Sequence, residues 1–369
     1  MKKQLPVITL VAPLPPPFGG MANQAKQLLR LLKEEGMTVH IVQVNAPYRP
    51  AVIAKIPMLR ALFRLLPYLR KLWTGIGKTD VVHVFANSGW AWHLFAVPAI
   101  WIGWLRKKPV VINYRGGEAE SFFRSSMGWI RPSMKKATTI VVPSGFLQEV
   151  FSAWQIKTEI VPNIIDLSRF KTVAKKEIIQ APHILVSRNL EAIYDVSTSL
   201  RAFAMVLVKY PDAKLTIAGE GPEAVKLLGL AGDLQCTDSV TFIGRVDNTR
   251  MPALYEEAHI ALNTSRVDNM PISILEAMAS GVPVVSTDAG GIPYLVQNGK
   301  SAILAPVGNH EALARAMLQI LDSPKLYKQL AEEGLKEARK YDWEQVKGRW
   351  FAIYENAASL EPPLNEELS

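Results

Sequence analysis

Short hydrophobic runs alternate with longer amphipathic segments along most of the chain. The runs are three to six residues long and rich in valine and isoleucine, which is typical of strands buried on both faces. Between several of them the apolar residues recur at helical spacing, as Leu28, Leu31 and Leu32 do. Strands that alternate with helices predict an α/β fold with parallel sheets covered on both faces. The expected strands lie at 7–11, 39–44, 81–85, 110–113, 139–142, 159–161, 184–187, 215–218, 240–243, 260–263, 284–286 and 302–304.

The pattern falls into two series of strands, which suits a chain of 369 residues that is too long for one hydrophobic core. We expect an N-terminal doubly wound domain over 1–168, a linker at 169–182 and a second such domain over 183–342. The segment 343–369 contains a helix at 343–357 and a tail. Because ligands bind at the carboxyl ends of strands in such sheets, two of these domains predict a shared cleft.

Two segments have some character of membrane signals. The N-terminal apolar run is short, contains Pro6 and is followed by prolines at 15–17 where a signal peptide needs a cleavage site, so we interpret it as the first strand. Residues 81–105 lack Lys, Arg, Asp and Glu, but they contain Gly89 and Pro98 among several polar residues. A strand, a turn and a helix explain this mixture better than a membrane span does.

The positive charge of the chain is concentrated in its N-terminal half. The formal net charge is +9, yet the segment between Gly36 and Gly117 alone contains eleven lysines and arginines against one acid, Asp80. This segment implies an anionic partner. The lone cysteine, Cys236, excludes an intramolecular disulfide and a cysteine-based metal cluster, as is typical of a reducing compartment. We therefore expect a cytoplasmic protein.

Residues 58–73 predict a basic amphipathic helix, or two short helices that Pro67 separates. Its apolar stripe either packs on the domain core or docks on an anionic membrane. Tryptophans at 73, 90, 92, 101 and 104 suit such an interface if they face outward. We expect a membrane surface to contact 55–108, and no nucleic-acid partner, because no nucleic-acid-binding module is recognisable. The stripe comprises Leu59, Leu62, Phe63, Leu66 and Leu69, and the charge comprises Arg60, Arg64, Arg70 and Lys71.

The segment 263–283 contains the densest candidate chemistry. A strand ends at a polar loop with Asp268, and a helix begins around Pro271, so its N-terminal N–H groups form an anion site. Asp268 and Glu276 flank that site, and carboxylates suit ribose or sugar hydroxyls while N–H groups suit a diphosphate. Ser273 and Glu276 also have capping-box spacing, so Glu276 alternatively only closes the helix.

Two glycine motifs each allow two interpretations. Gly19 and Gly20 follow the first strand and either satisfy turn geometry or let a diphosphate approach the backbone. Residues 219–224, G-E-G-P-E-A, fit a dinucleotide-binding fingerprint. Such a site needs an acid near the end of the next strand, where this chain has Gly244 and Arg245. The six histidines show no ligand spacing and there is no Asp-x-Asp, so we expect no metal.

Residues 268–285 end in L-E-A-M-A-S-G-V-P-V-V and resemble the E-x7-E region of the family 4 glycosyltransferases, which are retaining enzymes of the GT-B fold. The resemblance implies two Rossmann-like domains that face a central cleft, a nucleotide-sugar donor, and a last helix that packs back across the domain junction. Further motifs occur in the family's order: the glycine pair at 19–20, V-P-N-I-I-D at 161–166, G-E-G-P at 219–222, F-I-G at 242–244 and G-G-I-P at 290–293.

Carried over by position, the resemblance implies a catalytic set of Asp268, Glu276 and Arg188. Glu276 would bind the donor ribose, Arg188 the diphosphate, and the backbone at 269–272 the donor sugar or diphosphate. The implied donor-binding residues are Gly19, Gly20, Arg188, Gly219, Asp268, Asn269, Met270, Pro271, Ile272 and Glu276.

The chain departs from the family pattern at several of these positions. Asp268 replaces the first glutamate, Ile193 replaces the lysine five residues after Arg188, and Tyr294 replaces the glutamate after the G-G-x-P turn. We expect Arg266 or Arg115 to supply the missing charge, since a diphosphate leaving group needs cationic stabilisation. The family's His-Gly after the fourth strand is replaced by Tyr114, Arg115 and Gly116. Arg115 and Glu118 are the expected acceptor-side residues, with Glu118 either a base or an ordinary loop carboxylate.

The sequence thus predicts a metal-independent, retaining hexosyltransferase without a cofactor. It would move a sugar from a nucleotide sugar to a saccharide or lipid-linked acceptor in cell-envelope or extracellular polysaccharide biosynthesis, in the cytoplasm or at the inner face of the cell membrane. The alternatives are a dinucleotide-dependent oxidoreductase and a non-catalytic, membrane-associated GT-B module.

Overall fold

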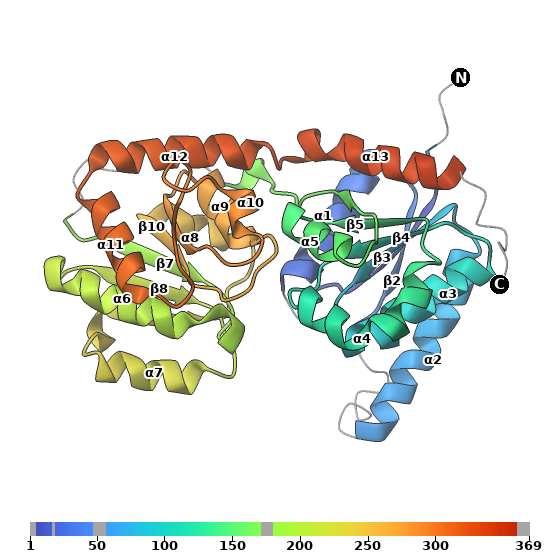
Figure 1. The fold of residues 1–369 in the computed structure, drawn as a ribbon, viewed down its shortest axis with the longest axis horizontal. Coiled ribbons are helices and arrows are strands. Elements are labelled where there is room, and N and C mark those ends of the chain that lie inside the picture. Colours follow the sequence, from blue (N-terminus) through green and yellow to red (C-terminus); the bar gives the residue numbers. More distant parts are fainter. Residues whose placement is uncertain (1–4, 17–18, 47–56, 171–179, 360–369) are drawn as a thin grey trace. The chain divides into compact units, whose positions relative to one another are not determined.

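The chain forms two compact units, each built around one parallel sheet with helices on both faces (Figure 1). The first unit comprises Met1–Ile164 and Val346–Ser369, and the second comprises Ile165–Gln345. Residues 165–170 therefore belong to the second unit, and most of the expected linker lies outside the described residues. The computed structural model describes residues 5–16, 19–46, 57–170 and 180–359, with the backbone alone described for 57–62.

The first unit contains a six-stranded sheet with the strand order β2-β1-β3-β4-β5-β6, in which all neighbouring strands are parallel. Its strands are β1 Ile8–Ala12, β2 Val39–Gln43, β3 Val81–Ala86, β4 Val110–Tyr114, β5 Thr139–Val142 and β6 Glu159–Ile160. Its helices are α1 Gly20–Glu34, α2 Pro57–Ile76, the π-helix η2 Trp92–Ala96, α3 Val97–Leu105, α4 Ala119–Met134, α5 Gly145–Ser152 and, from Val346 on, α13 Trp343–Ser359.

The second unit contains another six-stranded parallel sheet, with the order β12-β11-β10-β7-β8-β9. Its strands are β7 His183–Ser187, β8 Lys214–Ala218, β9 Val240–Gly244, β10 Ile260–Asn263, β11 Val284–Thr287 and β12 Ile303–Ala305. Its helices are α6 Val196–Lys209, α7 Ala224–Asp233, α8 Met251–Glu257, α9 Ile272–Ala279, α10 Ile292–Leu295, α11 His310–Leu321 and α12 Pro324–Arg339, with short 3-10 helices η3 Leu167–Arg169, η4 Ala192–Tyr194 and η5 Thr237–Ser239.

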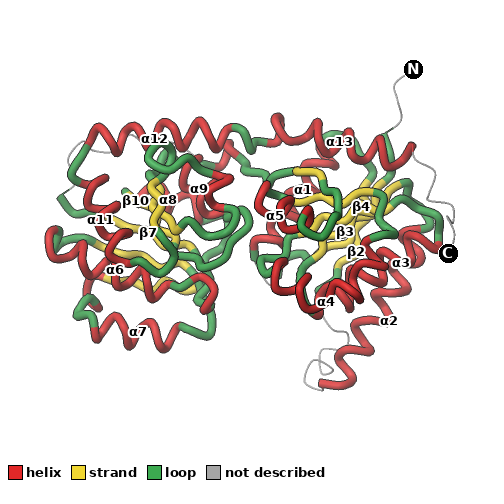
Figure 2. The backbone as a smooth tube through the Cα atoms, in the orientation of Figure 1, coloured by secondary structure: helices red, strands yellow, loops and turns green. Residues whose placement is uncertain are grey.

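The predicted α/β class and two strand series are confirmed, and every expected strand is present with ends that shift by at most one residue. Figure 2 shows the strands enclosed by helices within each unit. The segment 81–105 forms β3, η2 and α3, as the strand, turn and helix interpretation predicts. Among the described residues, no helix has both the length and the apolar character needed to cross a bilayer.

Helix α2 differs from its prediction in two ways. It continues through Pro67 without a break. Pro67 removes one backbone donor, but Tyr68 and Leu72 beyond it are buried in the core, and the Tyr68 hydroxyl donates to the Phe95 carbonyl at 2.6 Å. This packing keeps the second half of the helix in register. Its core-facing residues are Leu65, Tyr68, Leu69, Leu72 and Ile76.

The predicted apolar stripe of α2 is divided between two environments. Phe63 and Leu66 are 45% and 58% exposed, and the side chains of Leu59 and Leu62 lie outside the described residues. Of the three members whose side chains are described, Leu69 alone lies against the core. The sequence gives two adjacent apolar stripes on one helix, and the packing at Tyr68 selects the one that is buried. The exposed residues Phe63 and Leu66 are compatible with the docking interpretation.

The tryptophans proposed for an interface do not share one environment. Trp73 and Trp90 are 52% and 79% exposed, whereas Trp92 is fully buried in the core of the first unit. The expectation for Trp92 is therefore wrong, because η2 turns its ring against Tyr114 and Phe122. The remaining two, Trp101 and Trp104, are half-buried.

Helix α13 is joined to the sheet of the first unit through a buried histidine. In β3, alternate residues face opposite sides, and His83 points to the side where α13 packs. Its Nδ1 lies 2.7 Å from the Tyr354 hydroxyl and its ring lies 4.8 Å from that of Trp350. Burial lowers the pKa of His83 to about 3, so the ring is neutral.

We predict that Tyr354→Phe destabilises the first unit by about 1–3 kcal/mol, because it leaves the buried Nδ1 of His83 without its partner. Urea unfolding followed by tryptophan fluorescence measures this loss. The control is Tyr210→Phe, which removes an exposed hydroxyl bonded to Asp322 and should cost about 0.5 kcal/mol or less. Equal effects of the two variants would contradict the buried hydrogen bond.

Candidate functional site

The strand order of the second sheet fixes where a ligand can bind. From β7 the chain continues outward through β8 and β9, and it then returns to place β10 on the other side of β7. The loops after β7 and β10 therefore leave the sheet in opposite directions, which opens a crevice at the carboxyl ends of these two strands. Arg188 directly follows β7, and Asn263 ends β10.

Arg188 and Asp268 meet at this crevice. The Nη2 of Arg188 forms an ion pair with Oδ2 of Asp268, and both side chains are 13% exposed. The Nε of Arg188 donates to Oδ1 of Asn263 at 2.8 Å, and its guanidinium lies 5.0 Å from the ring centre of Tyr194. Contacts on three sides hold the arginine in one orientation at the strand ends.

Glu276 lies in α9 and is 8% exposed. Its Oε2 accepts a hydrogen bond from the Tyr255 hydroxyl at 3.2 Å. Burial raises the pKa of Glu276 to about 7, although Tyr255, Arg169 and Arg188 act in the opposite direction. The capping-box interpretation does not describe this residue, because the helix is capped at Pro271 and the partner of Glu276 is on α8.

The N-terminus of α9 provides further polar groups beside the ion pair. Asn269, Met270 and Pro271 are buried, and Ile272 is the first helical residue. The Ser273 Oγ is buried and has no hydrogen-bond partner among the described residues. The first N–H groups of a helix are free to bind an anion, and an unpartnered buried hydroxyl beside them marks a place for a polar ligand.

Glycines fix the backbone around the site by close packing. A Cβ at Gly291 would lie 1.8 Å from the Asn269 carbonyl oxygen, and the Gly291 N–H donates to the Asp268 carbonyl at 2.7 Å. Gly290 has a φ of +51°, and a Cβ there would lie 2.4 Å from the Asp268 carbonyl oxygen. Gly219 packs in the same way against the Arg188 carbonyl, 1.9 Å from a built Cβ. Gly219 thus positions Arg188 through backbone contact.

The glycine pair of the first unit has a different environment. Gly19 is extended and Gly20 begins α1, so neither residue needs a positive φ. A Cβ at either position would meet no atom of the described residues within 4 Å. Turn geometry and packing therefore do not require these glycines, which favours the interpretation that the backbone lies open to a ligand.

Arg115 and Glu118 follow β4 in the first unit. Glu118 is exposed, immediately before α4. Arg115 is largely enclosed: its Nε donates to Asn113 Oδ1 at 2.9 Å, and its Nη1 donates to Asn163 Oδ1. Burial lowers the pKa of Arg115 to about 10, which leaves it protonated at neutral pH.

Arg115 also fixes the proton of His83. Because an arginine only donates, the Asn113 oxygen faces Arg115, and the Asn113 Nδ2 donates to His83 Nε2 at 3.0 Å. The ring proton of the neutral histidine is then on Nδ1, where it donates to Tyr354. Arg115 thus belongs to a buried chain of hydrogen bonds that ends on α13.

Several residues around the candidate site in the second unit were not identified from the sequence. Tyr255, Asn263, Tyr194, Asp195 and Arg169 are single residues in ordinary helix, strand and loop contexts. The Arg169 Nη2 donates to the Asn248 carbonyl, and its charge acts on Glu276. Of these residues, Asn263 could have been predicted from its position alone, because it ends a strand that borders the crevice.

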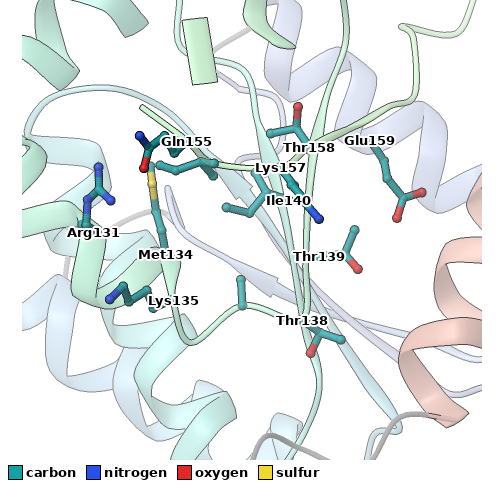
Figure 3. A pocket seen from close by; sticks show the side chains of 12 residues that line it. Arg131, Met134, Lys135, Thr138, Thr139, Ile140, Gln155, Lys157, Thr158 and Glu159 are labelled. Atoms are coloured by element: carbon teal, nitrogen blue, oxygen red, sulfur yellow. The ribbon is translucent and has the colours of Figure 1, made fainter. Parts of the chain in front are cut away.

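A cavity of about 550 Å³ lies elsewhere in the first unit (Figure 3). It lies at the amino ends of β5 and β6, away from the carboxyl ends of the strands where Arg115 lies. None of the predicted site residues lines it. Within the described residues, no three His, Cys, Asp or Glu side chains are placed to hold a metal ion. The residue after β9 is Arg245, which pairs with Glu220 at 3.2 Å, where a dinucleotide site needs an acid.

Two family models match successive parts of the chain. The model described as Glycosyltransferase Family 4 matches residues 18–169, and the model described as Glycosyl transferases group 1 matches residues 169–337. The second match contains Arg188, Asp268 and Glu276.

Among curated proteins, the N-acetyl-alpha-D-glucosaminyl L-malate synthase of Bacillus anthracis is 28% identical over 216 residues, or 58% of this chain. The match spans 55% of that relative's length. A phosphatidyl-myo-inositol mannosyltransferase of Mycobacterium tuberculosis is 25% identical over 371 residues, which cover 92% of this chain and 94% of that protein.

Solved structures share the architecture over almost the whole chain. The sucrose-phosphate synthase of Thermosynechococcus elongatus has a TM-score of 0.77 at 19% identity and covers 95% of this chain and 98% of its own. HepE of Anabaena, solved with UDP and glucose, has a TM-score of 0.73 at 17% identity and covers 96% and 99%. This likeness confirms the predicted GT-B fold.

We predict that the stability of the protein falls as the pH rises from about 4.5 to about 7, and that Glu276→Gln abolishes this part of the dependence. The folded protein binds the Glu276 proton more tightly than the unfolded chain does, so deprotonation in this window costs on the order of 3 kcal/mol. Urea unfolding of both proteins at several pH values measures the difference. Parallel pH profiles of wild type and variant would contradict the raised pKa.

Proposed function

Because the chain belongs to the family 4 glycosyltransferases, we propose that it transfers a hexose from a nucleotide-sugar donor with retention of configuration and without a metal ion. The acceptor is a saccharide or a lipid-linked precursor of a cell-envelope or extracellular polysaccharide. The observation that supports the donor site is the meeting of Arg188, Asp268 and Glu276 at the crevice between β7 and β10.

The donor diphosphate binds at the Arg188 guanidinium and the N-terminus of α9. Negative charge grows on the diphosphate as the bond to the sugar breaks, and fixed N–H donors together with a cation stabilise that charge. Arg188 is held from three sides before the donor arrives, so it pays little reorganisation when the donor binds. The unpartnered Ser273 Oγ supplies one more donor beside it.

Glu276 binds the ribose of the nucleotide. A carboxylate accepts hydrogen bonds from two neighbouring hydroxyls, and this is the pairing that its buried position allows. The ionised carboxylate is the form that accepts hydrogen bonds from both hydroxyls. Because the pKa of Glu276 is about 7, hydrogen bonds from bound ribose hydroxyls are enough to favour the ionised form at neutral pH. Asp268 keeps Arg188 in place and offers its second oxygen to the donor sugar.

We predict that Arg188→Ala lowers transfer from the nucleotide sugar by about 100-fold or more, because the leaving group loses its fixed cation. Thermal shifts with UDP, GDP, ADP and NAD first identify the nucleotide, and release of that nucleotide from its sugar conjugates then measures turnover. Arg315→Ala, an exposed arginine on α11, is the control and should leave turnover unchanged.

Three outcomes of this experiment discriminate among the functions. Stabilisation by NAD without stabilisation by any nucleoside diphosphate would support an oxidoreductase. Binding of a nucleoside diphosphate with no transfer or hydrolysis would support a non-catalytic module. Equal turnover of Arg188→Ala and wild type would contradict the assignment of the diphosphate site.

We also propose that the first unit docks on an anionic membrane through α2 and the end of α3, in the cytoplasm at the inner face of the membrane. Phe63, Leu66 and Trp73 form an exposed apolar stripe on one side of α2. Arg106 lies over the Trp73 ring at 4.7 Å, and Leu105 beside it is 61% exposed. Aromatic and apolar side chains beside cations are typical of proteins that lie on a lipid surface.

We predict that the protein floats with phosphatidylglycerol liposomes at low salt and that Phe63→Ser with Leu66→Ser removes most of this binding. The matched control changes Met205 and Val208, two exposed apolar residues with the same spacing on α6, to serine. The control should float like wild type. No flotation of the wild type, or equal loss in both double variants, would overturn the membrane proposal.

A further inference from the structure

The donor site lacks a cation for the charge that it must bind. Arg188 is the cation at the strand ends, but its charge is balanced by Asp268, and both side chains are mostly buried. The pair is therefore neutral as a unit, while a nucleoside diphosphate carries at least two negative charges at neutral pH. A further guanidinium with open N–H donors near Arg188 would therefore strengthen binding of the diphosphate.

Arg266 lies on the loop that also contains Asp268. Its backbone N–H donates to the Ile193 carbonyl at 2.8 Å, so it stands directly beside the turn η4. The same turn provides Tyr194, whose ring lies under the Arg188 guanidinium, and Tyr194 accepts a hydrogen bond from Thr264 Oγ1 at 3.1 Å. Both arginines therefore contact one short turn at the crevice.

The Arg266 side chain is anchored at one end and open at the other. Its Nε donates to Oδ2 of Asp195 at 3.0 Å, and Asp195 is itself 4% exposed. Ser197 and Thr198 donate to the same carboxylate, which fixes it at the start of α6. The Arg266 side chain is nevertheless 59% exposed, so its terminal nitrogens face solvent.

Other arginines of the described chain are less suited to this role. Arg169 is bonded to the Asn248 carbonyl and acts on Glu276, which places it on the ribose side of the site. Arg115 is engaged with Asn113 and Asn163 in the first unit. Arg245 pairs with Glu220 beyond β8.

We propose that Arg266, positioned by Asp195, is the second cation that binds the donor diphosphate. The inference rests on the proposed nucleotide-sugar donor and assigns the residue that completes its binding site. Ile193 stands where the family pattern has a lysine, and its backbone carbonyl accepts a hydrogen bond from the Arg266 N–H. The position that lacks the basic side chain therefore helps to hold the arginine that we propose in its place.

The test compares nucleotides that differ in phosphate alone. Calorimetric titration measures the affinity of wild type and variants for UDP, GDP and ADP and for uridine, guanosine and adenosine. Arg266→Ala should weaken binding of the preferred diphosphate by about tenfold, leave its nucleoside unaffected and reduce the salt dependence of binding. Arg266→Lys should retain most of the affinity.

Two further variants test whether the effect of Arg266→Ala comes from the loss of an arginine at this particular position. Asp195→Asn keeps the arginine but loosens its anchor, and it should weaken diphosphate binding by about threefold. Arg315→Ala, which removes another exposed and paired arginine, should change nothing. Unchanged thermal unfolding of Arg266→Ala without nucleotide shows that its fold is intact.

The outcomes distinguish this inference from the function on which it rests. If wild type binds none of the diphosphates, the proposed donor site is wrong. If wild type prefers a diphosphate over its nucleoside and Arg266→Ala keeps the same preference, the assignment of Arg266 is wrong. Loss of that preference in Arg169→Ala instead would assign the second cation to Arg169.

Discussion

The candidate site depends on a buried ion pair between Arg188 and Asp268. Removing two charges from water is costly, and the pair is tolerated because every neighbour contributes to its geometry. Asn263 takes the remaining face of the guanidinium, the Tyr194 ring supports it, and the Asp268 backbone is held by Gly291. The crevice between β7 and β10 provides the space, since no other pair of adjacent strands in this sheet sends its connections in opposite directions.

The two units use their polar groups differently. In the first, Arg115 is committed to internal bonds that reach α13 through Asn113, His83 and Tyr354. In the second, Arg266 keeps its terminal nitrogens in solvent and the Ser273 hydroxyl has no partner in the described chain. Internal satisfaction favours stability, whereas open donors favour a ligand. This contrast distinguishes the buried arginine of the first unit from the exposed arginine beside the crevice of the second.

The hydrophobic pattern predicted the strands because a doubly covered parallel sheet requires continuous apolar runs. Arg188, Asp268 and Glu276 were predicted from the resemblance to the family's motifs, and the structure places Arg188 and Asp268 in contact. Tyr255 and Asp195 were not, because their roles come from contacts across elements that no local spacing encodes. The sequence left open whether the predicted stripe of α2 packs on the core for a similar reason: two apolar stripes compete in the sequence, and the bond from Tyr68 to Phe95 decides which one is buried.

The glycine turn at 290–291 has a consequence for how this site can change over evolutionary time. At positions 290 and 291 the backbone packs directly against the backbone of Asp268 and Asn269, so a side chain at either glycine would displace that loop. Exchange between aspartate and glutamate at position 268 alters the reach of a carboxylate by one methylene while the peptide stays still. The turn thereby holds the peptide of this loop independently of the side chain at position 268, so the length of the carboxylate can vary without a change in the fold.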